Sequence, residues 1–162
     1  MQSKPFAEFL EIPLRNGLTK PKKVRGDGIK MVNMGELFKY PRMKNIPMDR
    51  APLTVKELST SMLEAGDLLF ARQSLVREGA GKCSIFLGDD EPVFFESHLI
   101  RCRLNKSAHN PIFYYYYFDS PQGKQAIDAI VEQGAGAAGI RGSDLSKLLI
   151  PEYPIEFQNP VA

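Results

Sequence analysis

The sequence predicts an α+β fold: a single globular domain with many short β-strands and a few helices, the helices lying mainly toward the C-terminus. The 162 residues match the length of one domain, and a content of 43% hydrophobic and 25% charged residues is typical of a soluble globular protein. The 13 glycines and 12 prolines separate short apolar segments along the whole chain, as in short strands joined by loops. Strand patterns dominate the middle of the chain and helix patterns its end, which favours α+β.

The first 53 residues are predicted to hold little regular structure. We expect residues 1–28 to be mostly irregular, apart from a short extended piece at Ile12–Leu14. The segment Ile29–Met34 is predicted to be a strand. Residues 35–53 contain three prolines and are predicted to be a loop.

A helix is predicted directly after this loop. Thr54 and Glu57 have the spacing of a capping box, in which the Thr54 side chain accepts from the Glu57 amide while the Glu57 side chain reaches back. Val55, Leu58 and Met62 then fall on one helical face. Gly66 is expected to end this helix.

The middle of the chain is predicted to be a series of strands. They are expected at Asp67–Gln73, Lys82–Leu87, Val93–Glu96 and Leu99–Leu104, the first two separated by a loop at Ser74–Gly81. The last of them alternates, so Arg101 and Arg103 should lie on the face opposite Cys102.

The C-terminal third is predicted to contain the remaining helices. The run Phe113–Phe118 fits either a helix or a strand by its period. Ser120 then caps a helix with Pro121 at its first position, and Gly134 is expected to end it. Residues 134–142 are predicted to be a flexible loop, followed by a helical turn at Asp144–Leu148 and a last strand.

No motif in the sequence predicts catalysis or a metal site. Cys83 and Cys102 are isolated and are expected to be buried thiols, and His98 and His109 lack the spacing of metal ligands. The sequence GAGAAG at 134–139 has the spacing of a dinucleotide-binding loop but follows a predicted helix rather than a strand. The Gly81–Lys82 dipeptide lacks the earlier glycine of a phosphate-binding loop. We therefore expect a binding protein that is not an enzyme, with no catalytic residue and no cofactor of its own.

The charge is unevenly distributed. The net charge is only +2, yet residues 1–50 hold eleven Lys and Arg against five Asp and Glu. Basic loops suit nucleic acid: lysine contacts phosphates, while arginine and glutamine can also read base edges. An exposed, solvated surface is the alternative for each such residue. The candidate DNA-binding residues are Lys20, Lys22, Lys23, Arg25, Asn33, Arg72, Gln73, Ser74, Arg77, Lys82 and Arg141.

The sequence resembles the specificity subunits of type I restriction–modification systems over roughly residues 12–158. Gly66–Arg72 is similar to the family's G-D-[IL]-L-[FL]-[ST]-R element, and the Gly81–Lys82 step follows at the expected place. The order of the other elements also fits: Asn16–Thr19 as the x-G-x-T opening, Pro111–Phe118 with Ser120 before a helix, Leu145–Leu149, and the closing Ile150, Pro151, Pro154, Glu156 and Gln158.

This resemblance implies that residues 1–162 form one target recognition domain, which lacks most or all of the spacer helix that follows it in the family. Such a domain reads one half of a bipartite site in double-stranded DNA. Its implied partners are the modification (methyltransferase) subunits and a restriction subunit, with a second specificity half as a further possibility. S-adenosylmethionine, ATP and Mg are expected only in those partners.

The alternative function is that of a truncated specificity subunit that acts mainly as a protein–protein module, either as a half-subunit or as a competitor for methyltransferase partners. The near-neutral net charge favours this alternative. The sequence has no apolar run long enough to cross a bilayer and no signal-peptide pattern at its start. We therefore expect a cytoplasmic protein with no membrane partner.

Overall fold

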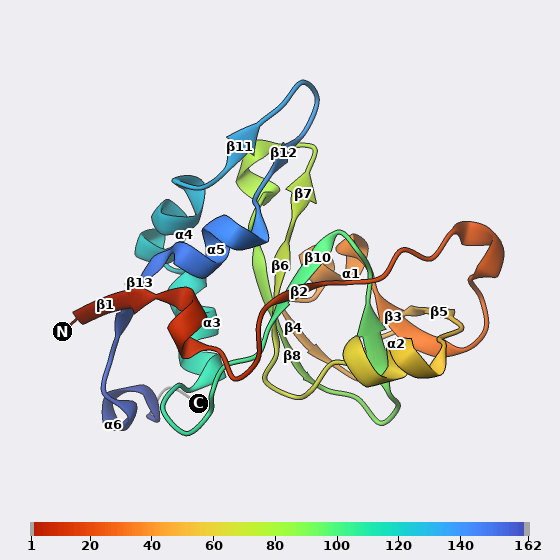
Figure 1. Ribbon diagram of the computed structural model, residues 1–162, viewed down its shortest axis with the longest axis horizontal. Helices are drawn as coiled ribbons and strands as arrows, with labels where there is room; N and C mark the ends of the chain where they lie inside the picture. Colours follow the sequence, from red (N-terminus) through yellow and green to blue (C-terminus); the bar gives the residue numbers. More distant parts are fainter. Residues whose placement is uncertain (1, 161–162) are drawn as a thin grey trace.

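A computed structural model describes residues 2–160, and a five-stranded β-sheet lies at its centre (Figure 1). The strand order is β2–β10–β6–β8–β4, antiparallel except for the parallel pair β4 and β8. The strands are β2 (Arg15–Asn16), β4 (Arg42–Lys44), β6 (Leu68–Ala71), β8 (Cys83–Gly88) and β10 (Leu99–Cys102). Three of the four strands predicted in the middle of the chain thus form the middle of this sheet as β6, β8 and β10, and the α+β prediction is confirmed.

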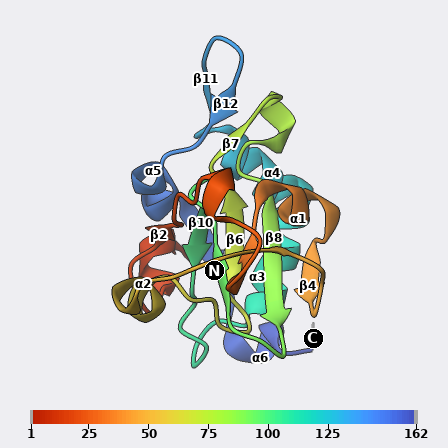
Figure 2. The same cartoon turned by 90° about the vertical axis from the view of Figure 1, so that its right-hand side faces the viewer.

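Strand β6 is buried on both faces because cores lie on both sides of the sheet. Leu68 and Phe70 pack into one core with the helices α3 (Pro111–Asp119) and α4 (Pro121–Asp128). Leu69 and Ala71 pack into the other core. Figure 2 shows α3 behind β6 and β8. Burial on both faces explains why this strand is a continuous apolar run rather than an alternating one.

The aromatic run whose period was ambiguous is the helix α3. Asn110 caps it, with Oδ1 accepting from the Ile112 amide at 3.0 Å, and Pro111 occupies the first turn. Tyr114, Tyr115 and Phe118 are buried, and Phe118 makes edge-on contact with Phe70. A helix that buries most of its circumference shows no clear amphipathic period, so the run alone could not decide between helix and strand.

A second sheet of three strands lies beside the first. Its order is β5–β3–β9, with β3 (Ile29–Val32) antiparallel to β5 (Asp49–Ala51) and parallel to β9 (Val93–Phe95). The prediction of a loop at 35–53 is wrong, because this region contains α1 (Met34–Lys39), β4 and β5. These two strands are short and pair with distant parts of the chain, so no local pattern identifies them.

The prediction of the helix α2 (Val55–Thr60) is confirmed at its start but wrong at its end. Thr54 Oγ1 accepts from the Glu57 amide at 3.2 Å, and Glu57 Oε1 accepts from the Thr54 amide at 2.9 Å. The helix ends at Thr60, and Met62 instead makes a β-bridge with Phe94. The expected apolar face is also absent, because Val55 is 85% exposed and α2 lies on the surface.

The alternation predicted for strand β10 is confirmed, because Cys102 packs into one core while Leu99 packs into the other and Arg101 lies over Phe95 of that second core. Arg101 is 4% exposed and donates from Nη1 to the carbonyl oxygens of Thr60 and Met62, at 3.2 and 3.0 Å. Arg103 binds the fully buried Asp67 through Nε and Nη2. The two arginines therefore hold the connection between α2 and β6 in place.

The N-terminal region is more ordered than predicted. It contains β1 (Gln2–Pro5), the 3₁₀ helices η1 (Phe6–Phe9) and η2 (Lys22–Val24), and β2, and the extended piece predicted at Ile12–Leu14 lies instead at Arg15–Asn16. Strand β1 pairs with β13 (Leu149–Glu152) from the other end of the chain. Phe6 and Phe9 are fully buried against α3, which explains why this end is fixed.

A three-stranded ribbon projects from the body of the domain (Figure 1). It consists of β7 (Gln73–Ser74), β12 (Ala138–Gly139) and β11 (Glu132–Gln133), and the 3₁₀ helix η3 (Arg77–Gly79) follows β7. The predicted helix after Ser120 is confirmed but ends at Asp128 rather than Gly134, and part of the predicted loop 134–142 is strand. The chain continues through α5 (Gly142–Lys147), which confirms the expected helical turn, then β13 and α6 (Ile155–Gln158).

Both cysteines are free and buried, as predicted. Burial raises the pKa of the Cys83 and Cys102 thiols well above the usual range, so both stay protonated near neutral pH. Of the helices within residues 2–160, none has the length and apolar character needed to cross a membrane.

Contacts between the two ends of the chain, where β1 pairs with β13, should make the stability of the fold depend on pH in the acid range. Glu152 accepts from Lys4 Nζ at 2.8 Å and lies 2.8 Å from His109 Nε2, and these hydrogen bonds lower the pKa of Glu152 below 4.5. A carboxyl whose pKa is lower in the folded state stabilises the fold above its unfolded pKa and loses this contribution as the pH falls through the folded value. We expect Glu152→Gln to be less stable than wild type at pH 7, with the difference closing below about pH 4.5.

Urea unfolding at a series of pH values measures this difference. Glu156→Gln, which changes an exposed carboxylate on α6, should follow the wild-type curve throughout. Parallel curves for wild type and Glu152→Gln would contradict the expectation.

Candidate nucleic-acid interface

Three segments that carry predicted DNA-binding residues meet at the turn Glu96–His98. The amide of Glu96 donates to the carbonyl oxygen of Val32 at 3.0 Å, and that of Ser97 donates to Leu18 at 3.0 Å. The Arg72 amide donates to His98 at 2.7 Å. The turn therefore joins the segments that carry Lys20, Asn33 and Arg72, which are far apart in the sequence.

Side-chain hydrogen bonds fix the shape of this turn. Glu96 is 5% exposed; its Oε1 lies 2.7 Å from both Ser97 Oγ and His98 Nδ1, and its Oε2 accepts from the His98 amide at 3.0 Å. Arg72 Nε donates to the Ser97 carbonyl at 3.0 Å. Among residues 2–160 this is the only side-chain hydrogen bond of Arg72, so its terminal nitrogens can donate to a ligand. His98, the residue after this carbonyl, is exposed.

Side-chain contacts of Lys20 and Arg25 fix the conformation of the basic segment 20–25. Lys20 Nζ is 2.9 Å from Glu57 Oε1. The hydrogen bond from the Thr54 amide, followed by this contact with Lys20, lowers the pKa of Glu57. Arg25 donates from Nε to the Lys20 carbonyl at 2.7 Å and from Nη1 to Asn33 Oδ1 at 3.3 Å. Lys20, Arg25 and Asn33 therefore brace the segment, while Lys22 and Lys23 are exposed on η2.

The ribbon carries the other predicted residues. Gln73 is exposed at its pairing position opposite Gly139, and Ser74 pairs opposite Ala138. Arg141 lies 3.1 Å from Glu132 across the hairpin. Arg77 donates from Nε to Asp128 Oδ1 at 2.9 Å, at the end of α4. Arg141 thus links to Glu132 across the ribbon and Arg77 links η3 to α4, while Gln73, the residue after Arg72, stays exposed.

Lys82 is placed apart from the turn. With Arg77 and Lys124 it lines a cavity of about 570 Å³ between η3, the start of β8 and α4. We name the remaining set, formed by the Glu96–His98 turn, the segment 20–25, Asn33, Arg72 and Gln73, the turn surface. Within residues 2–160, no three or more His, Cys, Asp and Glu side chains cluster as metal ligands would.

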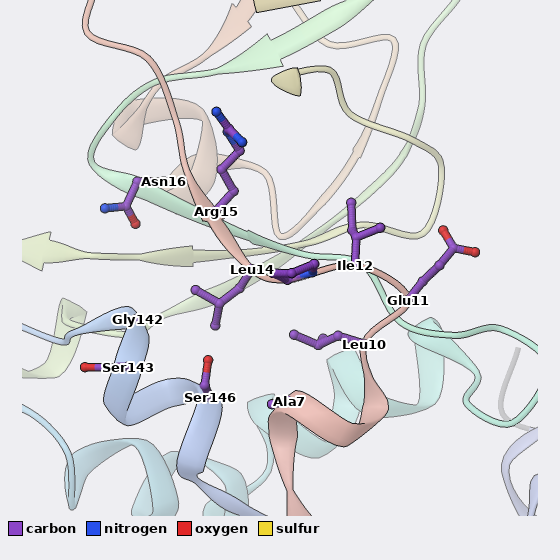
Figure 3. Close-up of a pocket in the computed structure, with 11 residues that line it drawn as sticks. Ala7, Leu10, Glu11, Ile12, Leu14, Arg15, Asn16, Gly142, Ser143 and Ser146 are labelled. Carbon is purple, nitrogen blue, oxygen red and sulfur yellow. The ribbon is translucent and has the colours of Figure 1, made fainter. Parts of the chain in front are cut away.

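A groove of about 890 Å³ adjoins the edge strand β2 (Figure 3). Figure 3 shows the N-terminal segment with Leu14, Arg15 and Asn16 on one side and Ser143 and Ser146 of α5 on the other. Arg15 and Asn16 are exposed and pair with Arg101 and Ile100 of β10. These two polar residues, with Glu96 and His98, are missing from the sequence-based list; the Asn16–Thr19 motif was the one signal that pointed to this edge.

The fold is shared with part of the specificity (S) subunits of type I restriction–modification systems. The HsdS subunit from Thermoanaerobacter tengcongensis matches with a TM-score of 0.67 and 13% identity over 99% of this chain and 35% of that one. The S subunit from M. genitalium matches with a TM-score of 0.53 and 17% identity, over 91% and 33%. A chain from a structure of type I restriction–modification complex assembly and conformational transition matches with a TM-score of 0.64 and 15% identity, over 99% and 36%.

The resemblance inferred from the sequence is thus confirmed at the level of the fold. The chain spans about a third of the length of the structures that it matches. No protein-family model and no curated protein matches the sequence.

Proposed function

We propose that this chain is a target recognition domain that binds duplex DNA and reads one half of the bipartite site of a type I restriction–modification system. The observation that carries the proposal is the turn surface, where the braced turn is hydrogen-bonded to Arg72, which precedes the exposed Gln73, and to Leu18, from which the chain runs on to the exposed Lys22 and Lys23. Arginine and glutamine can read base edges, and lysine adds sequence-independent phosphate contacts. The shared fold supports the same assignment.

The chain itself is proposed to perform no chemistry. Modification subunits that methylate adenine with S-adenosylmethionine, and a restriction subunit that uses ATP and Mg, would supply it, with a second specificity half reading the other part of the site. Two exposed apolar side chains near the end of the chain, Leu149 and Phe157, suit contact with such protein partners. The same observation favours the second candidate, a protein–protein module without DNA binding.

Binding of the 162-residue chain to duplexes selected from a random pool at low salt tests the proposal. The logarithm of the affinity should fall linearly with the logarithm of the salt concentration. Gln73→Ala should lose about 1–3 kcal/mol of discrimination at one base pair. Lys23→Ala should weaken all sequences alike and lower the salt slope by about one.

Lys124→Ala, which removes an exposed lysine on α4, is the matched control and should bind as wild type does. If the chain selects no duplex at low salt yet captures a modification subunit, the protein–protein alternative replaces the proposal. Equal losses on all sequences for Gln73→Ala and Lys23→Ala would remove Gln73 from base reading.

A further inference from the structure

The loop between β7 and η3 presents a large apolar side chain to solvent. Leu75 is 86% exposed, and it follows Gln73 of the turn surface by two residues. Single exposed leucines are common, so exposure alone says little. Leu75 differs because its loop is fixed by surrounding contacts and directly follows β7 of the projecting ribbon (Figure 1).

Contacts on both sides of Leu75 hold the loop in one conformation. The Val76 amide donates to Ser74 Oγ at 3.2 Å, and the Gly79 amide donates to the Val76 carbonyl at 3.2 Å. Gly79 is buried against Ser74 so closely that a Cβ at Gly79 would overlap the Ser74 hydroxyl. The ion pair of Arg77 with Asp128 fixes the loop farther along. The fixed loop thus keeps the Leu75 side chain exposed to solvent and prevents it from packing onto the core.

The inward position of Ser74 sets the direction of its neighbours. Ser74 is turned toward Gly79, while Gln73 before it and Leu75 after it are both exposed. Two residues of chain span at most about 7 Å. Bases along one DNA strand are spaced by about 3.4 Å, so this distance between the two Cα atoms corresponds to about two base pairs, and both side chains can reach the same short stretch of a bound duplex.

We propose that Leu75 is a specificity-determining residue that contacts the 5-methyl group of a thymine close to the base contacted by Gln73. The inference rests on the proposed function and assigns a second reading residue to the same surface. On the major-groove edge, an A·T pair presents donors and acceptors together with this one apolar group. An apolar side chain beside an amide that pairs with adenine therefore matches two neighbouring A·T pairs.

Replacing thymine by uracil removes only the methyl group and so isolates the contact. The probes are the duplexes that the 162-residue chain selects from a random pool, remade with one uracil at each thymine in turn. Wild type should lose about fourfold in affinity at one position, the effect of exposing one buried methyl-sized group. Leu75→Ala should bind the thymine and uracil forms of that duplex alike.

Val55→Ala is the matched control, because Val55 is 85% exposed but lies on α2. It should keep the fourfold difference, and circular dichroism should show all variants folded. Wild-type binding that is insensitive to uracil at every position overturns the proposal, as does a Leu75→Ala variant that keeps the difference. A Leu75 side chain wedged between base pairs would give this insensitivity together with a bent duplex.

The outcome also separates this inference from the proposed function. Selective duplex binding without any uracil effect leaves the target-recognition proposal standing and removes Leu75 from base reading. Failure to bind any duplex at low salt overturns both.

Discussion

Replacing Asp67 with alanine should lower the free energy of unfolding by about 3–5 kcal/mol, the loss expected when one partner of a buried ion pair is removed. Asp67 is fully buried, and its Oδ1 and Oδ2 accept from Nε and Nη2 of Arg103 at 2.9 and 3.0 Å. Its Oδ2 also accepts from the Glu64 amide at 2.7 Å. The substitution leaves a largely buried guanidinium and a backbone donor without their acceptor, in addition to any loss of packing.

Urea unfolding followed by circular dichroism measures this loss. Glu64→Ala is the matched control, because Glu64 Oε2 also contacts Arg103, at 3.4 Å, but its side chain is 56% exposed. An exposed pair contributes about 1 kcal/mol or less, so this control should stay close to wild type. Equal and small losses in both variants would show that the Asp67–Arg103 pair does not hold the α2–β6 connection.

Asp67 also explains why the Gly66–Arg72 segment has a recognisable sequence. Gly66 has φ +98°, a conformation that favours glycine, and Asp67 binds Arg103. Leu68–Ala71 is the strand buried on both faces, and Arg72 is the first residue that reaches the turn surface. These seven residues thus contain in turn a glycine turn, a buried ion pair, a core strand and a residue of the turn surface. Each depends on residue type at a fixed position, which is why the sequence alone placed this segment correctly.

The elements that sequence reasoning missed depend on partners far along the chain. Strand β4 forms by parallel pairing with β8, and β1 by pairing with β13 at the opposite end. Neither has a long apolar or alternating run, so its local pattern resembles a loop. The same limit applies to helix ends. The helix α2 ends at Thr60, and Met62 forms a β-bridge with Phe94, a residue distant in sequence that no local pattern around Met62 could indicate.

The sequence indicated which types of residue form the candidate site, but not how these residues are arranged in space. Basic and amide side chains on loops were the signal, and the turn surface brings several of them together. Their ion-pair partners could not be predicted, since Glu57 and Asp128 are distant in sequence from Lys20 and Arg77. Glu96, the buried carboxylate that organises the turn, gave no signal because a single glutamate after a strand is unremarkable without its contacts.

Gly17→Ala should separate the turn from the basic segment that leads to Lys20. The Gly17 amide donates to the Leu99 carbonyl at 3.1 Å, and the Leu18 amide donates to Phe95 at 3.0 Å, so the chain crosses the turn in close contact. A Cβ at Gly17 would overlap the carbonyl oxygens of Phe95 and Glu96, which are backbone atoms and cannot move aside independently. We expect a loss of about 1–3 kcal/mol in stability from this overlap.

The same substitution should weaken DNA binding even under conditions where the variant is fully folded, because the segment carrying Lys22 and Lys23 moves away from Arg72 and Gln73. Gly35→Ala is the matched control: Gly35 lies in the first turn of α1 with open space where a Cβ would stand, and alanine has a higher helix propensity than glycine. This variant should gain stability and bind DNA as wild type does. If Gly17→Ala matched wild type in both urea midpoint and affinity, the close crossing at Gly17 would not be what joins the basic segment to the turn surface.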